Sequence, residues 1–144
     1  MSNTRHRTSY LLKRVELLVR GRLESALKDL GITTGQYAAL SLLAKMPETS
    51  SAKLARSIGV TPQTITETIL AFEQRGLISR EQSAEHKRIM KITLTGAGTQ
   101  LLETCESRVS QTERNLFQSL DADQMEGLRT ALQAVLTDAA RYNQ

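Results

Sequence analysis

Cysteine and histidine are scarce in this sequence, which has one cysteine, Cys105, and two histidines, His6 and His86, among 144 residues. A single cysteine cannot form an internal disulfide. Metal sites in proteins usually combine several Cys or His ligands at fixed spacings, and three scattered side chains do not supply such a set. The sequence therefore predicts a fold that holds together without disulfides, a metal or a cofactor.

Aromatic residues and long apolar runs are scarce as well. Aromatics make up 3% of the chain, whereas hydrophobic residues make up 40%, so the predicted core is sizeable and aliphatic. No run approaches the roughly 18 apolar residues of a membrane span, and the N-terminal MSNTRHRTSY has no signal-peptide pattern. We expect one domain in a reducing, cytoplasmic compartment.

Residue groups typical of enzymes are also missing. The segment TGAG at 95–98 precedes a predicted helix, but it lacks the strand-and-loop context of a phosphate-binding loop. Nucleophilic catalysis would need Cys105 or a serine beside a histidine, yet His6 lies in the N-terminal tail and His86 in a predicted loop. We therefore expect no enzymatic activity.

Charge is distributed unevenly along the chain. The net charge is +4 and the isoelectric point is near 9.5. Basic residues outnumber acidic ones over residues 1–30 and 51–95, whereas acidic residues are in excess over 96–144. A local positive field attracts polyanions such as the phosphate backbone of a nucleic acid.

The most informative stretch runs from Ser51 to Thr95, because its first half predicts two short helices joined by a tight turn. The first helix spans Ser51 to Ile58 and ends at Gly59, which suits a left-handed turn. Thr61 is a predicted N-cap for the second helix, which starts at Pro62 and continues to about Arg75. Apolar residues recur at helical spacing on both: Leu54, Ala55 and Ile58, then Ile65, Ile69 and Phe72.

The second half of this stretch predicts a β-hairpin. LISR (77–80) and IMKITL (89–94) are rich in strand-forming residues, and a polar, charged tip from Glu81 to Arg88 separates them. A helix-turn-helix followed by a hairpin is a winged helix-turn-helix.

This arrangement favours DNA as the partner. A helix fits the major groove, where short polar side chains in its first turn reach base edges, and basic residues in a wing suit phosphates or a minor groove. The candidate DNA-binding residues are polar or charged and lie at the start of the second helix or in the hairpin: Thr61, Gln63, Thr64, Thr66, Glu67, Lys87, Arg88 and Lys91. The alternative is a winged-helix protein-interaction module without DNA binding.

Further amphipathic helices flank the central stretch. We predict helices over 8–30, over 34–45 behind an N-cap at Thr33, from Thr95 to a break near 119–120, and from an N-cap at Asp121 to about Tyr142. The helix after Thr95 shows one apolar face: Leu101, Cys105, Val109, Thr112 and Leu116. The last helix shows another: Met125, Leu128, Leu132, Val135, Leu136 and Ala139.

The terminal helices carry more apolar surface than a winged core of about 45 residues needs to cover itself. The simplest partner is a second copy of the chain, and a two-fold dimer would suit a palindromic DNA site. A helical bundle within a monomer is the alternative. The predicted fold class is mainly α with a small β-hairpin wing (α+β): a winged helix-turn-helix core with long N- and C-terminal dimerisation helices.

Two motifs, and the spacing between them, resemble those of the MarR family of bacterial transcriptional regulators. These are LARSIGVTPQTITETILAFEQRGLISR at 54–80 and KITLTGAG at 91–98, and the resemblance in element order covers nearly the whole chain. It implies one domain over 1–144, with a winged core at 31–95 and dimerisation helices at 8–30 and 96–142. It also implies a homodimer that represses or activates promoters and responds to a small molecule, often an aromatic acid, or to oxidants.

The resemblance assigns roles to individual residues. The recognition helix maps to 62–75, and the family's wing motif Asp-x-Arg maps to His86 and Arg88, so Arg88 inherits the minor-groove contact. The Asp that braces the wing in the family is replaced by His86, and the neighbouring Glu85 is the alternative brace.

For the effector, the resemblance indicates a pocket between the dimerisation helices and the winged core. Candidate effector-binding residues in that region are Tyr37, Leu40 and Met46, with Arg20 and Arg22 on the first helix as partners for a carboxylate. An oxidant-sensing regulator acting through Cys105 is an alternative, although a small core residue is the default interpretation of a cysteine on an apolar helix face.

Overall fold

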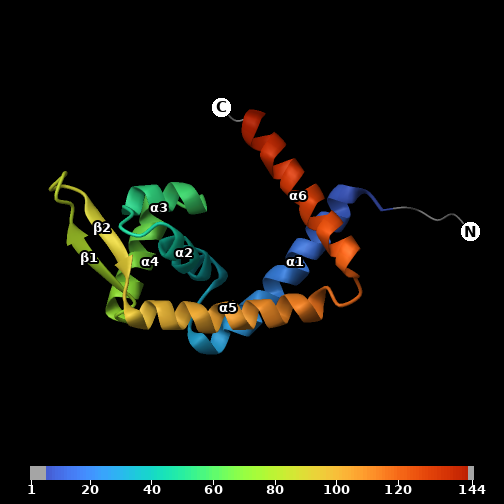
Figure 1. The fold of residues 1–144 in the computed structure, drawn as a ribbon, viewed down its shortest axis with the longest axis horizontal. Coiled ribbons are helices and arrows are strands. Elements are labelled where there is room, and N and C mark those ends of the chain that lie inside the picture. Colours follow the sequence, from blue (N-terminus) through green and yellow to red (C-terminus); the bar gives the residue numbers. More distant parts are fainter. Residues whose placement is uncertain (1–5, 143–144) are drawn as a thin grey trace, which may run out of the picture. The chain divides into compact units, whose positions relative to one another are not determined.

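The structure is a computed structural model that describes residues 6–142. Its elements, in chain order, are α1 (Thr8–Leu27), the 3₁₀-helix η1 (Lys28–Leu30), α2 (Thr34–Lys45), α3 (Ser51–Ile58), α4 (Pro62–Gln74), β1 (Ile78–Gln82), β2 (Met90–Leu94), α5 (Gly96–Leu116) and α6 (Ala122–Tyr142) (Figure 1). The expected fold class, mainly helical with a β-hairpin wing, is confirmed.

Helices start where the sequence provides side-chain caps. Before α2, the hydroxyl of Thr33 accepts the backbone N–H of Gln36 at 3.1 Å, and the Gln36 side-chain oxygen accepts the N–H of Thr33 at 3.0 Å. Before α6, Asp121 and Gln124 form the same reciprocal pair at 2.8 and 3.0 Å. Both predicted caps are confirmed, and these capping boxes fix the two helix starts.

Both strands start one residue later than predicted, at Ile78 and Met90, and two further boundaries differ from the sequence-based expectation. The first helix is regular only to Leu27, and its last turn tightens into η1, as is common at helix ends. The hairpin tip is shorter than predicted, because Glu81 and Gln82 belong to β1 and pair with Lys91 and Met90. Their polar side chains suggested a loop, whereas strand pairing depends on backbone hydrogen bonds that polar residues form equally well.

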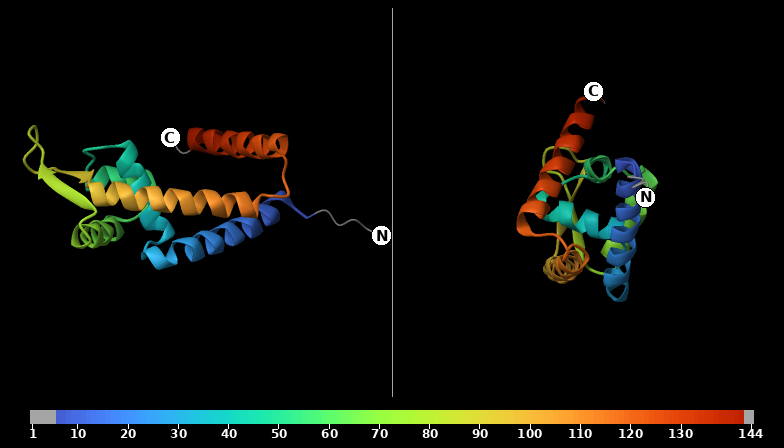
Figure 2. Two further views of the ribbon diagram at one scale, coloured as in Figure 1. Left: turned by 60° about the horizontal axis from the view of Figure 1, so that its bottom comes forward. Right: turned by 90° about the vertical axis from the view of Figure 1, so that its right-hand side faces the viewer.

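The hairpin is antiparallel, with Ile78 opposite Leu94 and Arg80 opposite Ile92. It extends beyond α2, α3 and α4, as two views show (Figures 1 and 2). The segment before α3 adds a short third contact, since the N–H of Ile92 donates to the carbonyl of Thr49 at 2.8 Å. The base of the wing is therefore tied to the helices and the tip projects freely.

The hydrophobic core is aliphatic, as the composition predicted, and lies where α2, α3, α4, the hairpin base and the start of α5 meet. Its fully buried side chains come from six elements: Leu27, Leu40, Leu43, Leu54, Phe72, Ile92 and Cys105. On α5 the buried stripe is Leu102, Cys105 and Val109, so Leu102 is buried and the predicted Leu101 is only half-buried.

The start of α5 approaches the hairpin backbone closely. The Thr95 hydroxyl accepts the N–H of Gly98 at 3.1 Å and donates to the Gly76 carbonyl at 2.6 Å. A Cβ atom on Gly98 would stand 2.1 Å from the carbonyl oxygen of Leu77. Only glycine permits this approach, so α5 is seated on the backbone that enters β1.

The chain divides into two compact units, residues 1–109 and 110–144. The second unit contains the end of α5, a turn and α6. Its apolar side chains around the turn are half-buried, among them Phe117, Leu120 and Met125. Farther along α6, Leu128 is half-buried, whereas Leu132 is 40% exposed and Val135 and Leu136 are each 66% exposed.

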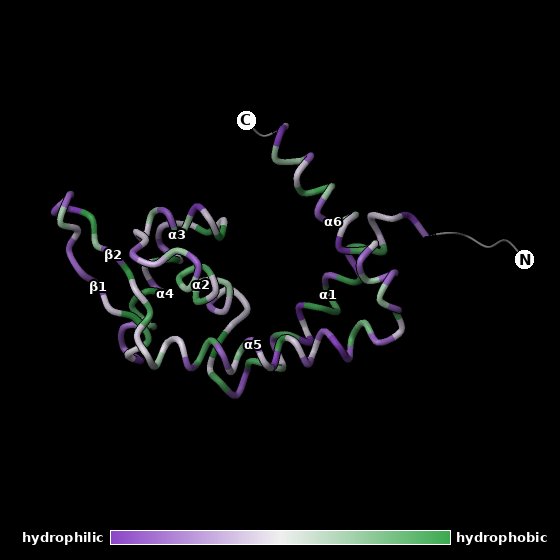
Figure 3. The backbone as a smooth tube through the Cα atoms, in the orientation of Figure 1, coloured by the Kyte–Doolittle hydropathy of each residue, from purple (hydrophilic) through white to green (hydrophobic). Residues whose placement is uncertain are grey.

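Helix α1 in the first unit alternates between apolar and hydrophilic residues (Figure 3), and most of its residues are exposed. Leu27 at its end is buried, whereas six of its large apolar side chains are each 44–50% exposed: Tyr10, Leu11, Leu12, Val15, Leu17 and Leu18. None of the helices within residues 6–142 is long and apolar enough to cross a membrane.

Candidate nucleic-acid interface

Helices α3 and α4 form the predicted helix-turn-helix. The Ser50 hydroxyl caps α3 by accepting the N–H of Lys53 at 3.2 Å. At its other end, Gly59 adopts a φ of 79°, a left-handed conformation that glycine enters without strain. The Thr61 hydroxyl then accepts the N–H of Thr64 at 3.1 Å, and Pro62 occupies the first turn of α4. Gly59, Thr61 and Pro62 act as predicted, whereas the Ser50 cap was not singled out from the sequence.

Helix α4 has a buried face and an exposed face. Ile65, Ile69 and Phe72 are 1–2% exposed and pack into the core. The five predicted contact residues from this region are exposed: Thr61, Gln63, Thr64, Thr66 and Glu67. The structure therefore brings these five together on one outward-facing surface.

Hydrogen bonds organise the exposed face. The Gln63 side-chain amide donates to the Glu67 carboxylate at 3.3 Å, one helical turn along. The Thr66 hydroxyl donates to the Pro62 carbonyl at 2.8 Å. These contacts within the helix limit the rotamers of the side chains before any ligand arrives.

The wing tip has a brace that sequence reasoning missed. The Ser83 hydroxyl, on a residue only 6% exposed, accepts the backbone N–H groups of Glu85 and His86, each at 3.3 Å. The Gln82 amide donates to the Lys87 carbonyl at 2.6 Å. The wing turn is thus held by Ser83 and Gln82. A serine at the start of a turn is a recognised signal for this kind of bond.

The three basic residues predicted in the wing are not equivalent. Lys87 and Arg88 are exposed at the tip. Lys91 lies in β2, where its ammonium group is 3.5 Å from the Glu48 carboxylate. Glu48 has a φ of 62°, which is unusual for a residue with a side chain. Lys91 is therefore partly neutralised, whereas the two tip residues point their charge outward.

Two arginines fix α4 to its surroundings, and neither was singled out from the sequence. Arg80 of β1 forms a two-pronged ion pair with Glu73 of α4, with the second prong at 3.0 Å. Arg75, at the end of α4, donates to the carbonyls of Leu30 and Gly31 at 2.9 and 3.0 Å. The recognition helix is thus joined both to the wing and to the end of η1.

Comparison with known proteins identifies the family to which this architecture belongs. The profile of the MarR family matches residues 32–90. The HTH-type transcriptional repressor Rv2887 of Mycobacterium tuberculosis is 32% identical over 129 residues, covering 90% of this chain and 93% of that protein. The chain belongs to the MarR family.

Solved structures of the same mycobacterial protein are similar in fold. Its complex with DNA has a TM-score of 0.79 at 28% identity, over 91% of this chain and 98% of that chain. Its complex with salicylic acid has a TM-score of 0.74 at 30% identity, over 92% of this chain and 98% of that chain. The resemblance to the MarR family is confirmed over the helices at both ends as well as the winged core.

In this MarR-family chain, the predicted effector residues lie in different environments. Leu40 is fully buried in the core, and Met46 is half-buried at the end of α2. Tyr37 is half-buried, and its burial, together with a hydrogen bond to Glu106, raises the pKa of its phenol to about 12. Arg20 and Arg22 are exposed on α1, with Arg20 3.4 Å from Glu16.

Helix α1, which carries Arg20 and Arg22, is anchored at its C-terminal end. Arg108 of α5 donates to the Ala26 carbonyl at 3.2 Å and pairs with the Asp29 carboxylate. The hydrogen bond from Arg108 lowers the pKa of Asp29. The junction at 26–31 is therefore held by Arg108 on one side and by Arg75 on the other.

Cys105 is a core residue by its surroundings. Its side chain is 0% exposed, and burial raises the pKa of the thiol. A reactive cysteine requires an accessible thiolate, which these surroundings disfavour. Across residues 6–142, no cluster of three or more His, Cys, Asp or Glu side chains is arranged to hold a metal ion.

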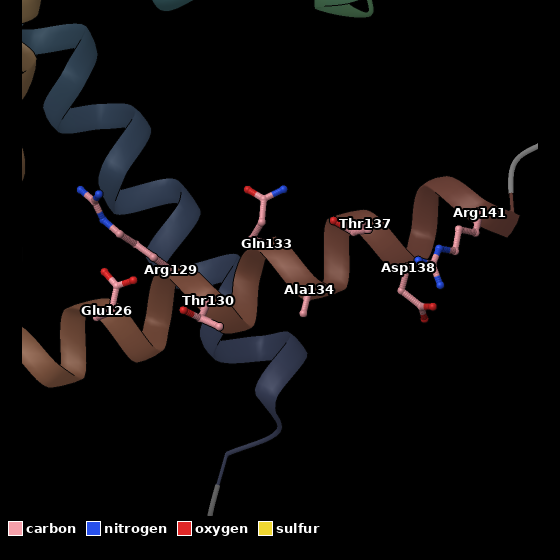
Figure 4. A pocket seen from close by; sticks show the side chains of 8 residues that line it. All are labelled: Glu126, Arg129, Thr130, Gln133, Ala134, Thr137, Asp138 and Arg141. Atoms are coloured by element: carbon pink, nitrogen blue, oxygen red, sulfur yellow. The ribbon is translucent and has the colours of Figure 1, made fainter.

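Helix α6 presents a largely polar face, whose side chains are drawn in Figure 4. Eight exposed residues line it: Glu126, Arg129, Thr130, Gln133, Ala134, Thr137, Asp138 and Arg141. All eight come from one helix, so this is an open helix face, unlike the enclosed, mostly apolar cavities that bind small molecules.

Proposed function

We propose that this protein is a homodimeric transcriptional repressor that binds a palindromic operator and is released from it by a small aromatic acid. The observation that carries the proposal is the exposed polar face of α4. This helix is the second helix of a capped helix-turn-helix, and a hairpin with a basic tip follows it. The related repressor of M. tuberculosis has been solved with DNA and with salicylic acid. This relationship supports the same two ligand classes here.

The dimer follows from the exposed apolar residues of the terminal helices. A monomer with Leu17 half exposed on α1 and Leu136 two-thirds exposed on α6 would show long apolar stripes to water. A two-fold copy provides the cover and places two α4 helices for two half-sites of one operator. The proposed functional domain is the whole chain, with a winged core at 31–95 and dimerisation helices at 8–30 and 96–142.

Base reading is assigned to α4 and backbone contact to the wing. In this assignment Thr61, Gln63, Thr64, Thr66 and Glu67 face the major groove. The wing residues Lys87, Arg88 and Lys91 contact phosphates or a minor groove.

The deciding experiment is selection of bound duplexes from a random DNA pool by the full chain. A dimer of winged helices should enrich a palindrome whose half-sites are about one helical turn apart. Failure to enrich any sequence would favour the protein-interaction module instead.

Arg88→Ala tests the wing. The variant should bind most sequences more weakly, and the slope of log K against log salt should fall by about 1 for each phosphate that the wing no longer neutralises. Glu85→Ala, on the same tip, is the control and should not reduce the slope. If Arg88→Ala leaves both affinity and slope unchanged, the wing does not touch DNA.

Effector release is tested by adding salicylate or p-aminosalicylate to the operator complex. Either acid should lower the operator affinity, and replacement of Arg20 or Arg22 by Ala should weaken the response if the carboxylate binds there. Tyr37 and Met46, both half-buried, form the remaining proposed wall, whereas Leu40 is fully buried in the core. An unchanged affinity at saturating salicylate would remove this acid class from the proposal.

A further inference from the structure

Helix α4 contains no lysine or arginine between Pro62 and Gln74. Guanine presents two acceptors, N7 and O6, to the major groove, and its commonest specific partner is an Arg or Lys that donates to both. The next residue along, Arg75, uses its guanidinium to bind the carbonyls of Leu30 and Gly31. The helix itself therefore lacks the usual group for reading guanine.

Two of the three threonine hydroxyls on α4 have also committed their protons, whereas the Thr64 hydroxyl accepts a hydrogen bond from the Thr61 hydroxyl at 3.0 Å. Thr66 donates to the Pro62 carbonyl at 2.8 Å, and Thr68 donates to the Thr64 carbonyl at 3.0 Å. A hydroxyl has one proton, so these two side chains offer lone pairs and methyl groups to a partner. Such groups suit the amino groups of bases and the thymine methyl.

The amide of Gln63 is held in one orientation by Glu67. One of its two N–H groups donates to the Glu67 carboxylate at 3.3 Å, which leaves the oxygen and the second N–H for a base. An acceptor beside a donor matches adenine, which offers an N6 amino group beside N7. Against guanine, the fixed amide oxygen would face another acceptor, and the Glu67 carboxylate would add a negative charge.

We propose that Gln63 selects adenine over guanine at one base pair of each half-site, and that Glu67 is the positioning residue that sets this choice by orienting the Gln63 amide. The inference rests on the proposed DNA-binding function and specifies which base the recognition helix reads. A free glutamine amide turns over by rotation, so without Glu67 its NH₂ end can donate to guanine.

The experiment is operator selection followed by binding measurements on duplexes that differ only at the contacted base pair. The wild type should prefer adenine over guanine by about tenfold or more, the size expected of one bidentate contact. Glu67→Ala should cut this ratio to about threefold or less. Gln63→Ala should abolish the preference at this base pair and leave the other positions unchanged.

Two further variants separate orientation from general damage to the helix. Glu67→Gln retains an oxygen for the Gln63 amide and should keep a higher adenine-to-guanine ratio than Glu67→Ala. Gln74→Ala removes an exposed glutamine at the far end of the same helix and should leave the ratio as in the wild type. A purely structural role for Glu67 would weaken all duplexes equally and would not move the ratio.

A neighbouring cation provides the main rival explanation. Arg56 of α3 lines the same groove as Pro62 and Thr66, so its guanidinium is the candidate reader of any guanine at this site. Selection of guanine by the wild type, abolished in Arg56→Ala, would overturn the inference. So would an identical ratio in Glu67→Ala and the wild type. Failure of the wild type to enrich any DNA would instead defeat the proposed function, and the inference with it.

Discussion

The winged core and the terminal helices use apolar residues in opposite ways. In the core, Leu40 and Leu54 are fully buried and their helices are closed by side-chain caps. On the terminal helices, by contrast, Leu17 of α1 is 50% exposed and Leu136 of α6 is 66% exposed. The core is thus complete within one chain, whereas the exposed apolar residues of the terminal helices suit the interface of the proposed dimer. Stability and assembly should therefore respond to different substitutions.

The largest effect is expected from a cavity in the core. Phe72→Ala removes a ring that is 1% exposed and should lower the free energy of unfolding by about 3–5 kcal/mol. Leu70→Ala, on the same helix but 47% exposed, is the matched control and should change it by only about 0.5 kcal/mol. Chemical denaturation measures both, and similar losses in the two variants would contradict the burial described for α4.

The next effect separates assembly from folding. Leu132→Lys, at a position that is 40% exposed on α6, should dissociate the proposed dimer because it places a charge in an apolar interface. Light scattering at micromolar concentration should then give the monomer mass, while circular dichroism stays helical. Gln133→Lys, on the polar face of the same helix, should remain dimeric. A wild-type protein that is already monomeric would remove the proposed dimer.

A smaller effect compares the same capping device in the two regions. Thr33→Ala and Asp121→Ala each break a capping box and should each cost about 1 kcal/mol. In a denaturation series, the loss from Thr33→Ala should not depend on protein concentration if the core folds within one chain. The loss from Asp121→Ala should do so if α6 is stabilised mainly by the partner. If only the loss from Thr33→Ala depended on protein concentration, the core and not α6 would be the region stabilised by the partner.

The smallest effect concerns pH at the edge of the core. Burial, and a hydrogen bond with Glu106, raise the pKa of Tyr37 to about 12, above the value near 10 of an unfolded tyrosine. A raised pKa contributes stability below the unfolded value, and this contribution is lost as the pH rises from about 10 through 12. Tyrosinate absorbance should show one group titrating near pH 12 in the native protein, and Tyr37→Phe should remove it.

Features governed by local chemistry were predictable from the sequence. Thr33, Thr61 and Asp121 cap their helices as expected, because a cap depends on residues three positions away. The stripe of Ile65 and Ile69 is buried because helical spacing alone puts both on one face.

Features governed by distant partners were not predictable in the same way. Arg75 contacts carbonyls more than forty positions away, and Arg108 reaches Ala26 and Asp29 across a still longer separation. Nothing in a single sequence marks such a pairing. The wing brace at Ser83 lies between these cases, since its partners are local but its burial depends on the folded hairpin.

The close seat of Gly98 on the Leu77 carbonyl has a consequence for how this sequence is able to diverge. Any other residue would place a carbon 2.1 Å from that oxygen, so the backbone would have to separate before the substitution is tolerated. The contact between α5 and the hairpin thus depends on Gly98 having no side chain. A lineage that retains this contact must retain the glycine, while the exposed residues around it are free to drift.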